Sequence, residues 1–238
     1  MNEIVGSTLY VVATPIGNLQ DLTLRGLKVL GEVNHLYAED TRVTQGMLQR
    51  HGIKRSVSSY REAADRGLLE RIITDILFKL KQGESVAYVS DAGSPGVSDP
   101  GNYLVSRVVA LGYSVVPIPG ASALPAILSV AGFPSMRPLF VGFLPKKKGH
   151  QTLMGKLKGA LESGVCDTVV FYESPERIVK LLGELMTWEM PLQVCLGREL
   201  TKLYEEIMRG TPEEVMSDLS KRATIKGEIT LAIYYEQP

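Results

Sequence analysis

The chain has 238 residues, of which 45% are hydrophobic and 22% are charged, and its formal net charge is zero. This length is enough for one large domain or two small ones with a buried core, and no run of residues is long and apolar enough to cross a membrane. The first residues, MNEIVGS, lack the apolar stretch of a secretory signal peptide, so we expect a cytoplasmic protein.

Strands and helices alternate through the first half of the chain. A β-branched run stops at Pro15, and a segment with helical spacing follows it, with Asp21 or Thr23 as its N-cap. The pattern predicts strands over residues 8–15, 34–40, 84–90 and 113–120, and helices over residues 21–33, 44–53, 66–83 and 100–112. Alternation at this spacing predicts a largely parallel sheet with crossover helices.

The second half of the chain changes character. Its pattern predicts helices over residues 121–134, 151–164, 175–188 and 211–222, and strands over residues 137–145, 166–174, 192–200, 203–210 and 228–236. Consecutive strands with little helix between them indicate a mixed sheet with antiparallel members. We therefore predict an α/β fold of two α/β domains, residues 1–117 with a largely parallel sheet and residues 118–238 with a mixed sheet.

Cysteine and histidine usage gives no sign of a metal site. Cys166 and Cys195 lie singly in strand-like runs, and the three histidines are far apart in the sequence. Isolated thiols without a CxxC pair are typical of buried apolar residues in a reducing compartment. We expect neither a bound metal nor a disulfide.

Three loops of unusual composition follow predicted strands. We call ATPIGNLQD (residues 13–21) the first loop, SDAGSPGVSDPG (90–101) the second and IPGASA (118–123) the third. Ligands of open parallel sheets bind at the carboxyl ends of the strands, and glycine lets the backbone approach them closely. One such loop is an ordinary turn, whereas three on neighbouring strands favour a small-molecule cleft. Because the loops lack GxxxxGK[ST] and GxGxxG, we expect a neutral or zwitterionic ligand with an apolar body.

Seven segments resemble, in order, the motifs of the tetrapyrrole-methylase superfamily. They are LYVVATPIGNLQDLTLRGLKVL, AEDTR, VAYVSDAGSPGVSDPG, VVPIPGASA, FYESPERI, GRELTKLYEEIMRGTPEEV and KGEITLAI, which together run from about Leu9 to Ile233. Within the superfamily they are similar to the branch of ribosomal RNA small subunit methyltransferases I. The motifs PIGNLxD, AEDTR and SDAGSPxxxDPG mark that branch, whereas precorrin and siroheme methylases carry a GxGxGD-type first loop.

The resemblance implies a homodimeric enzyme of two α/β domains, with S-adenosylmethionine bound in the cleft between them. The implied activity is methylation of the ribose 2′-hydroxyl of a cytidine in small-subunit (16S) ribosomal RNA, as free RNA or in the 30S subunit. The implied cofactor contacts are Ile16, Asp91, Ala92, Gly93, Ser94, Val97, Ser122, Ala123, Tyr172, Gly227 and Glu228. Members of this branch often continue with a further helical segment, and this sequence ends at Pro238, so we expect the basic segments to carry the RNA contacts.

The acceptor hydroxyl needs a proton acceptor, because a ribose hydroxyl is a poor nucleophile at neutral pH. The available carboxylates that follow strands are Glu39, Asp40, Asp91, Asp99 and Glu173. Asp40 is favoured as the base, with Glu39 and Glu173 as alternatives, because two adjacent carboxylates after a strand do not serve packing. Structural roles are the competing explanations: an ion pair of Asp40 with Arg42, an Asx-turn at Asp91 and, favoured for Asp99, an N-cap of the helix that begins near Pro100.

Charge is distributed unevenly along this neutral chain. Residues 1–161 carry 18 basic and 12 acidic side chains, whereas residues 162–238 carry 8 basic and 14 acidic ones. Basic residues gather between Arg42 and Arg66, with Tyr60 among them, and again between Lys146 and Lys158. Arginine beside an aromatic ring suits unpaired RNA. We predict RNA contacts by Arg42, Arg55, Arg61, Lys146, Lys147 and Lys148, with a solvated loop as the alternative for the lysines.

Two other functions fit part of the sequence. A precorrin-like tetrapyrrole methyltransferase of the same fold would use Arg42 and Arg61 for the carboxylates of its substrate, but its first loop would differ from TPIGNL. A non-catalytic, ligand-sensing RNA-binding module would use the same loops without transferring a methyl group. Transfer of a labelled methyl group to 30S subunits separates these functions from an RNA methyltransferase.

Overall fold

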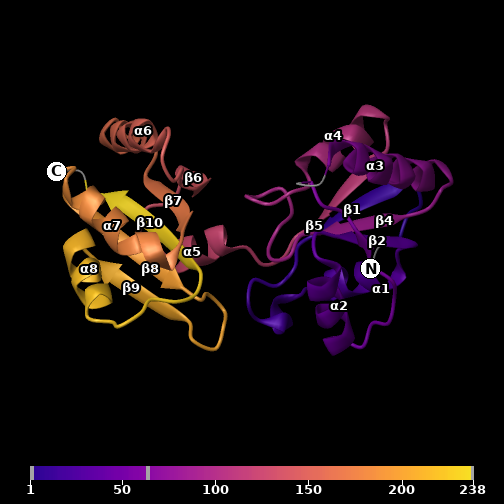
Figure 1. The fold of residues 1–238 in the computed structure, drawn as a ribbon, viewed down its shortest axis with the longest axis horizontal. Coiled ribbons are helices and arrows are strands. Elements are labelled where there is room, and N and C mark those ends of the chain that lie inside the picture. Colours follow the sequence, from indigo (N-terminus) through magenta and orange to yellow (C-terminus); the bar gives the residue numbers. More distant parts are fainter. Residues whose placement is uncertain (1–2, 63–64, 237–238) are drawn as a thin grey trace. The chain divides into compact units, whose positions relative to one another are not determined.

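The computed structural model describes residues 3–62 and 65–236 of the chain. The chain divides into two compact units, Met1–Ser122 and Ala123–Pro238 (Figure 1). The division falls at the start of helix α5 (Ala123–Ala131), whereas the sequence placed it after Pro117. Among the described helices, none combines the length and the apolar character that a membrane span requires.

Unit 1 is built on a five-stranded sheet in the order β3-β2-β4-β1-β5, and all its paired strands run parallel. Its strands are β1 (Thr8–Val12), β2 (His35–Ala38), β3 (Ser58–Ser59), β4 (Val86–Val89) and β5 (Ser114–Ile118). This confirms the predicted parallel sheet. The sequence did not indicate β3, because two exposed serines at an edge carry no alternating apolar pattern.

Helices cover both faces of this sheet (Figure 1). Helices α1 (Leu24–Glu32) and α2 (Thr41–Arg50) bury their apolar residues against one face, and α3 (Arg66–Lys81) and α4 (Asn102–Ala110) against the other. Alternate residues of β1 supply the two cores, because successive strand side chains point to opposite faces. Val12 belongs to the α1–α2 core and Leu9 to the α3–α4 core.

The helix starts refine the sequence predictions. A short 3-10 turn, η1 (Leu19–Asp21), precedes α1, and the Thr23 hydroxyl caps α1 by accepting from the Gly26 amide at 3.0 Å. Helix α4 begins after Gly101, which provides no side-chain cap. The prediction that Asp99 caps this helix is therefore wrong.

Unit 2 contains a mixed sheet, as the sequence predicted, and its strands lie in the order β6-β7-β10-β8-β9. Its strands are β6 (Pro138–Phe143), β7 (Thr168–Glu173), β8 (Leu192–Arg198), β9 (Glu206–Gly210) and β10 (Ile229–Tyr235). Among the described strand pairs of this sheet, only β6–β7 is parallel. Helices α6 (His150–Glu162), α7 (Pro175–Met186) and α8 (Pro212–Ser220) share its large apolar core, and α5 packs against β8 and β10.

The charge asymmetry of the sequence lies within unit 2 rather than between the units. Unit 1 carries 12 basic and 12 acidic side chains, and unit 2 carries 14 of each. In unit 2, residues 123–161 hold six basic and no acidic side chains, so the rest of the unit is acidic. Five of these six basic side chains lie in the loop between β6 and α6 and in α6 itself, so the basic charge of unit 2 is concentrated there.

Candidate functional site

The three loops lie together at the carboxyl ends of the strands of the first sheet, because they follow β1, β4 and β5, which are adjacent and parallel. We call this side of the sheet the loop edge. The first and second loops are joined by a pair of backbone hydrogen bonds. The Thr14 amide donates to the Gly93 carbonyl at 2.8 Å, and the Gly93 amide donates to the Thr14 carbonyl at 3.0 Å. The Thr14 hydroxyl also donates to the Ser90 carbonyl at 3.2 Å. These bonds hold two of the predicted loops together as one platform.

Gly93 is the point at which all three loops approach one another. Its φ of +79° lies in the left-handed region, which side chains with a Cβ rarely adopt. A Cβ atom built on Gly93 would lie 3.5 Å from Cγ2 of Ile16 and 3.8 Å from the carbonyl oxygen of Ala121. The space beside this glycine is thus bounded by the first loop and the third loop, and a side chain would fill it.

The charges of these loops suit a cationic ligand. The three loops contain Asp21, Asp91 and Asp99 and no lysine or arginine. Asp99 is half-buried, and burial raises the pKa of its carboxyl, with the nearby Asp91 acting in the same direction. A ligand that carries both a positive charge and an apolar body therefore fits this edge better than a phosphate does.

Asp40 has a structural role at the next loop of the same edge, between β2 and α2. Its carboxylate is the N-cap of α2, accepting from the Arg42 amide at 2.9 Å. The same carboxylate accepts from Nε of Arg42 at 3.1 Å and from a terminal nitrogen at 2.6 Å. The hydrogen bonds from Arg42 hold the pKa of Asp40 well below its usual range. A carboxylate held in this way is a weak base, so the geometry favours the ion pair over the catalytic role.

Glu39 has a different environment, although it is the neighbour of Asp40. It is half-buried, and burial raises the pKa of its carboxyl, followed by the negative charges of Asp91 and Asp99. The backbone around it is tied to the second loop, because the Asp40 amide donates to Oδ1 of Asp91 at 2.9 Å. Nε of Arg61 donates to the Glu39 carbonyl at 3.3 Å, which places Arg61 beside Glu39.

A pocket of about 350 Å³ opens between the first loop and α2. Thr14, Pro15 and Leu19 line it from the first loop, and Ser90 and Asp91 from the second. Its α2 wall contains both arginines of that helix, Arg42 and Arg50. Sequence reasoning predicted the loops, but it did not place α2 across from them.

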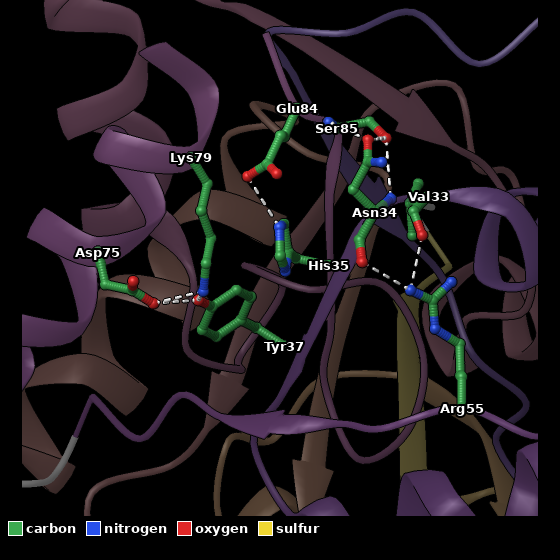
Figure 2. A network of polar contacts seen from close by, with 9 residues as sticks. All are labelled: Val33, Asn34, His35, Tyr37, Arg55, Asp75, Lys79, Glu84 and Ser85. Atoms are coloured by element: carbon green, nitrogen blue, oxygen red, sulfur yellow. Dashed lines mark hydrogen bonds and ion pairs between the residues drawn. The ribbon is translucent and has the colours of Figure 1, made fainter. Parts of the chain in front are cut away.

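Arg55 serves the fold, and Figure 2 shows its guanidinium directed at Val33 and Asn34. Its guanidinium donates to the carbonyls of Leu30 at 2.8 Å, Val33 at 2.6 Å and Asn34 at 3.1 Å. These carbonyls lie at the end of α1 and just before β2, at the amino ends of the strands. Burial lowers the pKa of Arg55. The guanidinium is thus committed to the backbone, and the structure gives no support to Arg55 as an RNA contact.

The rest of Figure 2 shows the polar contacts beside Arg55. Tyr37 donates to Asp75 at 2.5 Å and accepts from Lys79 at 2.6 Å, so that β2 is fastened to α3. Burial, and then the hydrogen bond to Asp75, raises the pKa of Tyr37 to about 12. His35 contacts Glu84 at 2.9 Å. These contacts fasten β2 to α3 and to the residue that precedes Ser85 and β4.

The predicted residues of unit 2 gather at one end of its sheet. Ile229 pairs with both Glu173 and Arg198, so the ends of β7 and β8 lie beside the start of β10. Glu173 is buried, and its carboxylate contacts Arg177 at 2.6 Å and accepts from the Ser174 amide at 2.6 Å. A carboxylate with these partners is a structural ion pair, which weakens the case for Glu173 as a base.

Gly227 and Glu228 take part in a charged network at that end of the sheet. Gly227 has a φ of +100°, and a Cβ atom on it would meet Cγ of Glu199 at 2.5 Å. Nζ of Lys202 lies 2.9 Å from Glu199 and 3.1 Å from Glu228, and joins the two carboxylates. Tyr172 lies nearby on β7, where its ring packs edge-on against Phe140 and Phe143. This network was not predicted, because its members come from two loops distant in sequence, one after β8 and one before β10.

The three lysines of the second basic segment are all exposed in the loop between β6 and α6. Within the described part of the chain, no ion pair involves Lys146, Lys147 or Lys148. Their charge is therefore available to a polyanion. Groups of three or more potential metal ligands do not occur among the described residues.

Comparison with known proteins places the chain among methyltransferases. The sequence profile of the tetrapyrrole (corrin/porphyrin) methylases matches residues 8–216. The chain is 41% identical to ribosomal RNA small subunit methyltransferase I of Thermotoga maritima, over 94% of this chain and 97% of that protein. It is 42% identical to the protein of the same name from Borrelia garinii subsp. bavariensis, with the same shares covered. Uroporphyrin-III C-methyltransferase from Thermus thermophilus, complexed with S-adenyl homocysteine, has a similar fold, with a TM-score of 0.61, 18% identity, and coverage of 94% of this chain and 96% of that one.

Proposed function

This chain belongs to the tetrapyrrole (corrin/porphyrin) methylase family, and from that premise we propose that it methylates small-subunit ribosomal RNA with S-adenosylmethionine as the donor. The acceptor that we propose is the ribose 2′-hydroxyl of a cytidine. The observation that carries the donor assignment is the convergence of three loops on Gly93, where a Cβ atom would fill the space between Ile16 and Ala121. The identity with the two ribosomal RNA methyltransferases supports the RNA substrate.

The residues present fit S-adenosylmethionine. Its sulfonium and ammonium groups match loops that carry aspartates and no cationic side chain. Its apolar and ribose parts match the small residues and backbone groups around Gly93. We propose that Ile16, the segment from Asp91 to Val97, and Ser122 hold it in unit 1.

S-adenosylmethionine supplies, when bound, a methyl group activated by its positive sulfur. The chain has to position the acceptor in line with that group and to accept the proton of the ribose hydroxyl. We propose Glu39 for the second task, in preference to Asp40, whose oxygens are occupied by Arg42. The Glu39 carboxylate would accept the proton of the ribose hydroxyl as the hydroxyl oxygen takes the methyl group that the bound donor supplies, and the donor would leave as S-adenosylhomocysteine.

Methyl transfer to small ribosomal subunits tests this function. We expect purified protein to transfer a labelled methyl group to 30S subunits that lack the modification, and nuclease digestion should return the label as 2′-O-methylcytidine. Label found on a base would contradict the ribose assignment. Label found only on an added tetrapyrrole would support the tetrapyrrole alternative, and donor binding without transfer to either would support a sensing module.

The family resemblance also supports a homodimer that works in the cytoplasm. The mass of one chain is 26.0 kDa. Light scattering coupled to size-exclusion chromatography should return twice that mass. A mass equal to one chain would contradict the dimer without affecting the proposed reaction.

Changing Lys146, Lys147 and Lys148 together to glutamate is expected to weaken binding to 30S subunits. Because these lysines are exposed and lack ion pairs among the described residues, they are free to displace counterions from RNA. Each lysine–phosphate interaction that is lost should make the negative slope of log affinity against log salt shallower by about 0.7–0.9. Donor affinity measured by calorimetry should stay unchanged. If RNA affinity and its salt slope stay as in the wild type, these lysines are only a solvated loop.

A further inference from the structure

The pocket between the first loop and α2 has two kinds of wall. Apolar side chains line it on both sides, with Pro15 and Leu19 from the first loop and Val43 and Met47 from α2. Val43 and Met47 are one helical turn apart and therefore lie on the same face of α2. A flat apolar ring would be sandwiched between the helix and the first loop. The volume of about 350 Å³ is within the usual range of small-molecule sites, about 300–1,000 Å³.

Arginines form the rim of the same pocket. Arg50 is exposed and enters no ion pair with any residue that the structure describes. Arg42 spends two of its donors on Asp40, and a guanidinium has five N–H donors in all. An apolar interior with guanidinium groups at its mouth matches a nucleotide, whose base is flat and whose phosphates are anionic.

The charges also separate this pocket from the donor site. Arg42 and Arg50 would repel the sulfonium of S-adenosylmethionine from this pocket. The three loops around Gly93, in contrast, carry only acidic charge. Yet half of the pocket's lining residues belong to the first and second loops, namely Thr14, Pro15, Gly17, Leu19, Ser90 and Asp91. A molecule in the pocket would therefore lie next to the donor.

Gly46 of α2 lines this pocket without a side chain. A Cβ atom built on Gly46 would meet nothing within 4 Å, and the residue has ordinary helical geometry. Glycine weakens a helix interior by about 1 kcal/mol relative to alanine. The pocket is thus open at Gly46, a position where alanine would make α2 more stable.

We propose that this pocket takes an unpaired nucleotide of the RNA substrate, with its base between α2 and the first loop and its phosphates at Arg42 and Arg50. This inference rests on the proposed function and adds the place where the acceptor strand is gripped. The pocket cannot take a base that is stacked in a duplex, so the nucleotide must be single-stranded or flipped out.

Filling the pocket from Gly46 tests this assignment. We expect Gly46→Leu to lower the affinity for 30S subunits at least tenfold, while affinity for S-adenosylmethionine stays within twofold of the wild type. The melting temperature should not fall, because a helix glycine is removed. The matched control is Gly31→Leu, since Gly31 is an exposed glycine of α1 with open space around its Cβ position and lies outside the pocket.

Arg50→Gln supplies a second, independent measurement. It should weaken binding to 30S subunits and reduce the slope of log affinity against log salt by about 0.7–0.9. The assignment is overturned if Gly46→Leu binds subunits as tightly as Gly31→Leu, or if it loses the donor instead. A wild-type protein that neither binds nor methylates 30S subunits would overturn the proposed function, and the pocket assignment with it.

Discussion

Gly93→Val is expected to abolish the binding of S-adenosylmethionine. The valine side chain would enter the space between Ile16 and Ala121. A Cβ atom at this position already lies 3.5 Å from Cγ2 of Ile16 and 3.8 Å from the carbonyl oxygen of Ala121. Filling that space should cost about 100-fold or more in affinity, which corresponds to about 2.7 kcal/mol. Isothermal titration calorimetry with S-adenosylmethionine measures the effect directly.

The control has to separate the filling of this space from backbone strain, because valine at a φ of +79° is strained wherever it occurs. Gly112→Val serves this purpose. Gly112 has a φ of +77°, is exposed, and has open space around its Cβ position in the turn between α4 and β5. Both variants should lose similar stability, and only Gly93→Val should lose the donor. Equal donor affinity in the two variants would falsify the assignment of the three loops.

Glu39→Gln is expected to lower the single-turnover rate of methyl transfer by about 10²–10⁴, the usual contribution of a general base. The amide keeps the size of the side chain and removes its basicity. Asp40→Asn should lower the rate less than about tenfold, because asparagine is also a good N-cap and the carboxylate it replaces is a weak base. Affinities for donor and 30S subunits should be retained in Glu39→Gln.

Stability provides a readout that separates the two neighbours. The pKa of folded Glu39 is raised by burial, so its charged form is less favourable in the folded than in the unfolded protein. This cost is absent at pH values below the ordinary pKa of glutamate, about 4.3, and develops as pH rises through the folded pKa. Glu39→Gln should therefore raise the melting temperature at pH 7 and leave it unchanged at low pH.

Asp40 should behave in the opposite way. Its pKa is lowered by Arg42, so it stabilises the folded state above the ordinary pKa of aspartate and loses that contribution as pH falls. Asp40→Asn should lower the melting temperature at pH 7. If Asp40→Asn instead shows the large loss of rate at full stability, and Glu39→Gln methylates normally, then Asp40 is the base that the sequence favoured.

The sequence by itself determined most of the helices and strands of unit 1, without β3, and the ends of the strands at which the three loops lie. Alternating strands and helices specified the parallel sheet of unit 1, because the apolar period of each segment depends only on neighbouring residues. The loops of residues 13–21, 90–101 and 118–123 were identifiable by their glycines and prolines. Their meeting at one edge followed from parallel strands, whose carboxyl ends lie together.

The tertiary structure decided which charged groups are free. Arg55 and Arg42 look alike in a basic segment, yet Arg55 is committed to carbonyls at the opposite edge of the sheet. Glu39 and Asp40 are adjacent, yet one is half-buried beside Asp91 and Asp99 while the other is held by Arg42. These differences depend on burial and on partners distant in sequence, and electrostatic energies vary steeply with both. For the same reason the pocket beside Gly46 could not be foreseen, because its two walls meet only when α2 packs next to the first loop.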